Sequence, residues 1–167
     1  MSDLHNEIIK AEKKAQAVME LLIKRRIKLA LAESCTAGLI SALLANTSGA
    51  SSVLWGSFIC YTQEAKIQML DLDKSDLDKN GLVSRETACK MAEGALKKSG
   101  GVLAAAVTGY AEGGGNDAPA GTVHAAVASS SGTEHKAFHF TGFRNEVRAK
   151  AAAAVLEMLR KYIFNLT

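Results

Sequence analysis

The sequence is poor in several residue types that mark specialised classes of protein. It has one proline, aromatic residues make up 5% of it, and its three cysteines have no CxxC spacing. With 48% hydrophobic residues, this composition argues against a disordered or fibrous chain. The isolated cysteines indicate neither a disulfide framework nor a zinc site, and they suit a reducing compartment.

Long apolar runs and a strong excess of charge are also absent. No stretch approaches the roughly 18 apolar residues of a membrane span, and the N-terminal segment "MSDLHNEIIK" lacks the apolar centre of a signal peptide. The net charge of +3 is too small for a dedicated nucleic-acid binder. We therefore expect a cytoplasmic protein that binds neither membranes nor nucleic acid.

One local basic cluster consists of Lys24, Arg25, Arg26 and Lys28. We interpret it as a solvated helix C-terminus, where cations complement the helix dipole. A nucleic-acid patch is the alternative, but no aromatic residues interleave with these charges to form a stacking platform.

The hydrophobic pattern predicts one α/β domain over residues 1–167. Apolar residues recur at spacings of three and four from Leu4 to Ile27, which predicts an N-terminal helix over 3–27 ahead of a core at 28–167. Predicted strands cover 28–33, 51–61, 102–109, 122–130 and 133–141, and the last two form a hairpin. Predicted helices cover 35–46, 63–70, 85–99 and 146–164, with Thr62 and Ser84 as N-caps, and 71–81 is a polar loop or a helical turn. Together these elements predict a three-layer α/β/α sandwich with a mixed, mostly parallel five-stranded sheet.

The stretch "LALAESCTAGLIS" places Ser34 where a strand passes into a helix. Ligands of open α/β folds bind beyond the carboxyl ends of strands, and N–H groups of a first helical turn, here those of Cys35 and Thr36, are free to hold an oxyanion. Ser34 is therefore either a nucleophile or simply the N-cap of the helix.

A nucleophilic serine needs a base. The four histidines lie on the first helix and on the hairpin, and we interpret them as surface or satisfied sheet residues. His135 and His139 would be roughly 13 Å apart along a strand, too far to share a metal ion. Lysine is the other known base when burial lowers its pKa. Lys66 lies one turn into the helix after the strand that ends near Tyr61, although the spacing fits an exposed helix lysine equally well.

The loop "TGYAEGGGNDAPAG", from Thr108 to Gly121, contains five glycines. Such a loop is either a ligand-binding segment or an ordinary solvent loop, and it matches neither a P-loop nor a dinucleotide fingerprint. Arg144 opens the last helix, where an arginine and free N–H groups can hold a phosphate, although an exposed arginine is more common.

Five segments, "AESCTAGLISALL", "GSFICYTQEAKIQML", "VSRETACKMAEGA", "TGYAEGGGNDAPAGTVHAAVA" and "FTGFRNEVR", together resemble the CinA C-terminal-domain family in order and spacing. The resemblance runs from about Ile27 to the C-terminus. It implies an amidohydrolase that converts nicotinamide mononucleotide to nicotinic acid mononucleotide and ammonia. It further implies a homodimer and no metal or other cofactor.

In active members of the family the serine of the ESCT motif is the nucleophile, and a tyrosine and a lysine assist it. The corresponding catalytic residues here are Ser34, Tyr61 and Lys66. The expected substrate-binding residues are Cys35, Thr36, Gly38, Thr108, Gly109, Gly114 and Arg144.

The sequence departs from the family pattern at two places in these motifs. Ala37 stands where the family has the first glycine of ESCTGG, and Glu112 replaces a small residue of the glycine-rich loop, where Gly113 stands for the expected proline. If this loop contacts a phosphate, Glu112 adds a repelling charge, which Arg144 can answer. Only a helix precedes the motifs, so we expect a stand-alone deamidase-type domain without ADP-ribose hydrolysis.

Three rival interpretations remain. The first is a catalytically silent family member that binds a nucleotide or a protein. The second is a DNA-uptake factor, which the small net charge disfavours. The third is thiol chemistry at Cys35, because a helix N-terminus can lower the pKa of a thiol.

Overall fold

The structure, a computed structural model, describes residues 3–101, 103–114 and 118–166. Its elements are, in order, α1 (Asp3–Arg25), β1 (Leu29–Glu33), α2 (Leu39–Ala45), the 3₁₀ turn η1 (Ala50–Ser52), β2 (Leu54–Ile59), α3 (Gln63–Leu70), α4 (Lys74–Asn80), α5 (Arg85–Ser99), β3 (Leu103–Gly109), β4 (Thr122–Ser129), β5 (Gly132–His139) and α6 (Arg144–Asn165).

The strands form one sheet in the order β2-β1-β3-β4-β5. β1 is parallel to β2 and to β3, while β4 is antiparallel to β3 and to β5. Four of these five strands therefore share one direction and β4 opposes them. The predicted mixed, mostly parallel sheet and its terminal hairpin are confirmed.

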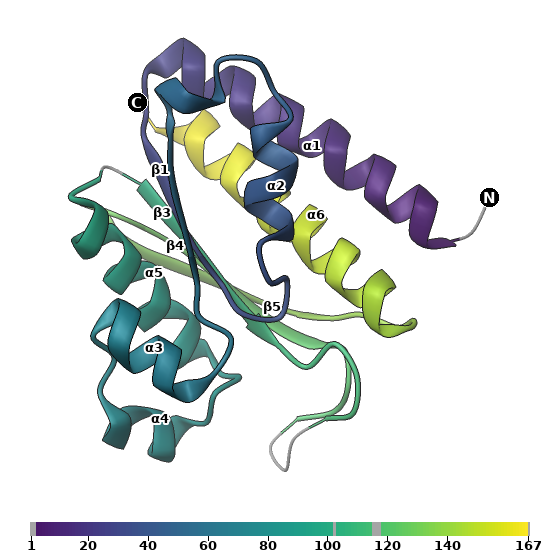
Figure 1. The fold of residues 1–167 in the computed structure, drawn as a ribbon, viewed down its shortest axis with the longest axis vertical. Helices are drawn as coiled ribbons and strands as arrows, with labels where there is room; N and C mark the ends of the chain where they lie inside the picture. The colour runs from purple at the N-terminus through teal and green to yellow at the C-terminus, as the bar shows by residue number, and fades with distance from the viewer. Residues whose placement is uncertain (1–2, 102, 115–117, 167) are drawn as a thin grey trace.

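Helices cover both faces of the sheet, as predicted. Figure 1 shows α1, α2 and α6 on one side and α3, α4 and α5 on the other. The central strands alternate between the two layers: Leu29 and Leu31 of β1 belong to the core on the α6 side, and Ala30 and Ala32 to the core on the α5 side. The sheet is thus buried on both faces, which explains why β1 and β3 are almost entirely apolar.

Most helix boundaries follow from their caps. The Thr62 hydroxyl accepts a hydrogen bond from the Ala65 N–H at 3.2 Å, and Ser84 accepts one from the Thr87 N–H at 3.1 Å, so both predicted N-caps are confirmed. Segment 71–81 contains α4, capped by Asp73. Among the described residues, no helix is long and apolar enough to cross a membrane.

The helix that follows β1 begins later than predicted. It was expected from residue 35, but α2 begins at Leu39, after a turn over 34–38. The backbone of this turn is left-handed at Ala37 (φ +49°) and Gly38 (φ +91°), which a right-handed helix cannot accommodate. The N-cap of α2 is Gly38, so the interpretation of Ser34 as that cap is wrong.

Candidate active site

Ser34 follows β1 directly at the carboxyl end of the parallel strands. Its backbone N–H donates to the Val107 carbonyl of β3 at 3.0 Å, which continues the ladder one residue beyond the strand. Its side chain is 7% exposed. The sheet therefore holds this hydroxyl group at the carboxyl ends of the parallel strands, where ligands of α/β folds bind.

Lys66 reaches Ser34 from α3. The lysine is 1% exposed, and its Nζ donates hydrogen bonds to Ser34 Oγ and to the Cys60 carbonyl, both at 3.0 Å. Burial lowers the pKa of Lys66 from 10.5, because the charged ammonium is poorly solvated in this position. A lysine with a lowered pKa beside a serine hydroxyl is the arrangement of a serine-lysine dyad.

The Glu33 carboxylate, which the sequence patterns did not single out, organises the turn beside the dyad. Glu33 is 1% exposed and accepts five hydrogen bonds. The donors are Thr36 Oγ1 at 2.8 Å, the N–H groups of Gly38, Ile40 and Ser41 at 3.0, 3.0 and 2.9 Å, and Ser57 Oγ at 3.2 Å. Three free N–H groups at the start of α2 are thereby satisfied from the preceding strand. The signal in the sequence was a lone acid at the end of an otherwise apolar strand.

Arg148 of α6 holds the same turn from the other side, and it too was missed. Its guanidinium group donates to the carbonyls of Cys35 (3.2 Å) and Thr36 (2.9 Å). Because a trans peptide is planar, fixing the Cys35 carbonyl directs the Thr36 N–H the opposite way. Within the described part of the chain, the N–H groups of Cys35 and Thr36 donate to no oxygen. These N–H groups are available to bind an anion, although they precede α2 instead of opening it.

A cavity of about 200 Å³ opens over the dyad. Seven of the predicted site residues line it, namely Ser34, Cys35, Tyr61, Lys66, Thr108, Gly109 and Arg144. Glu112 lines it as well. Residues that lie up to 110 positions apart in the sequence thus meet in one cavity.

Tyr61, Arg144 and Glu112 form an exposed polar cluster in this lining. The Tyr61 hydroxyl accepts a hydrogen bond from Arg144 at 2.6 Å, and Arg144 lies 3.8 Å from the Glu112 carboxylate. Tyr61 is 50% exposed. Its hydroxyl is therefore engaged with Arg144, while the Ser34 hydroxyl meets Lys66 directly.

Thr108 and Gly109 shape the cavity wall. The Thr108 hydroxyl donates to the Leu82 carbonyl at 2.8 Å, which ties β3 to the segment ahead of α5. Gly109 has no room for a side chain, because a Cβ atom there would lie 2.8 Å from the Thr122 carbonyl oxygen. Both residues therefore help to fix the position of the backbone in the cavity wall.

The other three predicted substrate-binding residues are not among those that line the cavity. Thr36 is fully buried with its hydroxyl on Glu33, and Gly38 supplies the left-handed turn. Gly114 lies in the glycine-rich loop, where a Cβ atom would lie 2.7 Å from the Ala118 carbonyl oxygen. Residues 115–117 of that loop lie outside the described residues.

The Cys35 thiol differs from the expectation of a reactive cysteine. Burial raises the pKa of Cys35 to about 12, and the nearby Lys66 and Arg148 only partly oppose this. This direction is opposite to the lowered thiol pKa that a nucleophilic Cys35 would need, so it disfavours thiol chemistry at this residue. Among the described residues, no cluster of three or more histidine, cysteine, aspartate or glutamate side chains could hold a metal ion.

Relatives of the chain share its sequence over most of its length. A CinA-like protein of Syntrophomonas wolfei is 40% identical over 140 residues, which cover 83% of this chain and 34% of that protein. A putative competence-damage inducible protein of Acetivibrio thermocellus is 40% identical over 149 residues, covering 88% and 36%. The chain thus spans about a third of the length of these curated relatives.

Solved structures share its fold. The competence damage-inducible protein A (ComA) of Klebsiella pneumoniae superposes with a TM-score of 0.91 at 31% identity, covering 94% of this chain and 99% of that one. The competence/damage inducible protein CihA of Agrobacterium tumefaciens gives 0.88 at 35% identity, covering 93% and 96%. The sequence model of the CinA C-terminal domain matches residues 11–163. The chain belongs to the CinA C-terminal domain family.

Proposed function

We propose that this chain hydrolyses the carboxamide of nicotinamide mononucleotide to nicotinic acid mononucleotide and ammonia, with Ser34 as the nucleophile. The observation that carries the proposal is the 3.0 Å contact between Lys66 Nζ and Ser34 Oγ, two buried groups at the wall of a cavity. Membership of the CinA family, together with the serine and lysine motifs of its active members, supports the same assignment.

Acylation begins with proton transfer. Neutral Lys66 accepts the proton of the Ser34 hydroxyl while Oγ attacks the carboxamide carbon, and the carbonyl π electrons move onto oxygen. The N–H groups of Cys35 and Thr36 are suited to stabilise that oxyanion. The Lys66 ammonium then returns the proton to the amide nitrogen, the C–N bond breaks, and ammonia leaves an ester on Ser34.

Deacylation repeats these steps with water. Lys66 accepts a proton from the attacking water molecule and returns it to Ser34 Oγ as the ester bond breaks. The product is nicotinic acid mononucleotide, whose new carboxylic acid loses its proton to the solvent. Glu33 and Arg148 take no proton in this scheme; they hold the turn on which the oxyanion site depends.

Arg144 and Tyr61 are placed to contact the polar part of the nucleotide. Arg144 carries the positive charge that a phosphate requires, and Tyr61 offers a hydroxyl group beside it. Glu112, 3.8 Å from Arg144, competes with a phosphate for the same guanidinium group. We expect this competition to weaken substrate binding without altering the chemistry at Ser34.

The test is ammonia release from nicotinamide mononucleotide by the purified protein, beside Ser34→Ala and the matched surface variant Ser130→Ala. We expect turnover by the wild type and by Ser130→Ala, and a loss of about 10³-fold or more in Ser34→Ala. No turnover by the wild type, with nucleotide binding retained, would favour a catalytically silent binding protein instead.

A further inference from the structure

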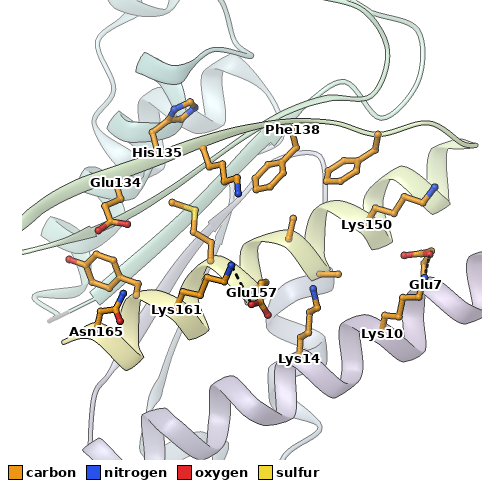
Figure 2. A pocket seen from close by; sticks show the side chains of 16 residues that line it. Glu7, Lys10, Lys14, Glu134, His135, Phe138, Lys150, Glu157, Lys161 and Asn165 are labelled. Atoms are coloured by element: carbon orange, nitrogen blue, oxygen red, sulfur yellow. Dashed lines mark hydrogen bonds and ion pairs between the residues drawn. The ribbon is translucent and has the colours of Figure 1, made fainter. Parts of the chain in front are cut away.

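A second, larger hollow lies away from the dyad, between β5, α6 and α1. Its volume is about 580 Å³, and none of its lining residues lines the cavity over Ser34. Figure 2 shows side chains from all three elements directed into it, with Lys10 and Lys14 from α1, Lys150, Glu157 and Lys161 from α6, and Phe138 from β5. We call this hollow the β5 groove.

The floor of the β5 groove is apolar. The rings of Phe138 and Phe140 stack at 5.6 Å between centroids, and Met158 and Ala154 continue the surface along α6. All four side chains are only partly buried. Ala154 leaves the space open, because a methyl side chain projects little from the helix. Burial of a ligand's apolar groups against this floor would stabilise the complex.

Charge around the β5 groove is predominantly positive. Its lining contains five lysines and three glutamates. Two of the glutamates have cationic partners: Glu7 pairs with Lys10 at 2.7 Å, and Glu157 pairs with Arg160 at 2.8 Å and with Lys161 at 3.8 Å. Glu134 belongs to the same strand as Phe138 but lies four residues before it, about 13 Å along β5.

Two lysines of the lining lack a close carboxylate partner. Within the described residues, neither Lys14 nor Lys136 makes a hydrogen bond or a close ion pair, although the Glu157 carboxylate attracts Lys14 at longer range. Lys136 Nζ lies 5.4 Å from the centroid of the Phe138 ring. Lys136 thus places a cation at the aromatic end of the floor, and Lys14 faces the groove from α1, which matches a ligand with an apolar body and one negative group.

We propose that the β5 groove is a binding site for an amphipathic organic anion, whose apolar part covers Phe138 and Phe140 and whose negative group pairs with Lys14 and Lys136. This site is separate from the cavity over the dyad, and the proposal does not depend on the reaction proposed there.

Two fluorescent probes of similar shape test the proposal: anilinonaphthalene sulfonate, which is an anion, and neutral phenylnaphthylamine. We expect saturable binding of the anion to the wild type. Combined Lys14→Glu and Lys136→Glu substitution should weaken its binding about tenfold while changing binding of the neutral probe less than about twofold. Ala154→Trp should fill the groove above its apolar floor and weaken the binding of both probes. Lys79→Glu on α4 is the matched control, and far-ultraviolet circular dichroism checks each fold.

Three results would overturn the proposal. The first is that the anion binds the charge-reversed variant as tightly as the wild type. The second is that Ala154→Trp leaves the affinity of both probes unchanged. The third is that light scattering detects a dimer and that the probe binds only after the dimer dissociates. The groove would then be an interface between copies of the chain.

Discussion

At the level of single residues, the proposed hydrolysis requires Lys66 to be neutral when Ser34 attacks. This buried amine donates hydrogen bonds to a hydroxyl group and a carbonyl group, and within the described residues it forms no ion pair with a carboxylate. Burial therefore dominates, and the pKa of Lys66 falls below 10.5. The same residue links activity and stability to pH.

The pH dependence of Lys66 has a definite sign. We expect kcat/KM to rise with pH through the lowered pKa and then level off, because only the neutral amine accepts the serine proton. Between that pKa and 10.5 the unfolded chain holds a proton that the folded chain lacks, so the free energy of unfolding also rises with pH. Urea unfolding at a series of pH values should show this rise in the wild type and its loss in Lys66→Met. An equal rise in both proteins would exclude Lys66 as its source.

Ala37 is one of three non-glycine residues with a left-handed backbone in the described part of the chain, beside Arg26 and Asp71. Its φ of +49° lies in the left-handed region, where the Cβ atom crowds the backbone. This conformation costs alanine about 1 kcal/mol relative to glycine. Part of this is offset because glycine makes the unfolded chain more flexible. We expect Ala37→Gly to raise the free energy of unfolding by about 0.5 kcal/mol, measured by urea denaturation. The control Ala42→Gly, inside α2, should lower it by about 1 kcal/mol; destabilisation by both would contradict the assignment.

At the scale of elements, α2 depends on a carboxylate from outside the helix. Glu33 is the last residue of β1, yet its carboxylate accepts hydrogen bonds from the N–H groups of Gly38, Ile40 and Ser41. A buried carboxylate that satisfies several donors is costly to replace, because each donor left unpaired loses its hydration without compensation.

We therefore expect Glu33→Gln to lower the free energy of unfolding by about 2 to 4 kcal/mol, since its amide nitrogen would face donors in place of an acceptor. Urea denaturation measures this, with Glu12→Gln on the exposed side of α1 as the control, expected to change stability by less than about 0.5 kcal/mol. A loss no larger than that of the control would mean that α2 does not need this cap.

The sequence predicted elements best where local rules decide them. Thr62 and Ser84 cap their helices as predicted, and the apolar run of β3 is a buried central strand. The start of α2 was missed because a left-handed turn intervenes, which helical periodicity does not encode. Arg148 was missed because its contacts with the turn after β1 span more than 110 residues, and only the fold creates them.

At the scale of the whole molecule, α6 joins the site to the ends of the fold. Its first turns bring Arg144 to Tyr61 and Arg148 to the turn after β1, while its last carbonyls are held by Arg25 of α1. Arg25 donates to Ile163 at 2.7 Å, to Phe164 at 3.3 Å and to Leu166. The basic cluster is exposed at the C-terminus of α1, as expected, and Arg25 in addition caps the C-terminus of a second helix, α6.

Loss of that contact should be measurable. We expect Arg25→Ala to lower the free energy of unfolding by about 1 kcal/mol, because the carbonyls at the end of α6 lose a cationic donor. The neighbouring Lys24→Ala should change it by less than about 0.5 kcal/mol. Thermal or urea unfolding distinguishes the two, and equal effects would assign the stabilisation to overall charge instead of to this contact.

The central claim is that Ser34 and Lys66 act as one unit in amide hydrolysis. The most direct measurement is a double-mutant cycle on kcat/KM for ammonia release from nicotinamide mononucleotide, with Ser34→Ala, Lys66→Met and the double variant. We predict that each single substitution lowers kcat/KM by about 10³-fold or more and that the double variant is no worse than either. Losses that multiply in the double variant, or wild-type turnover by Ser34→Ala, would contradict the account.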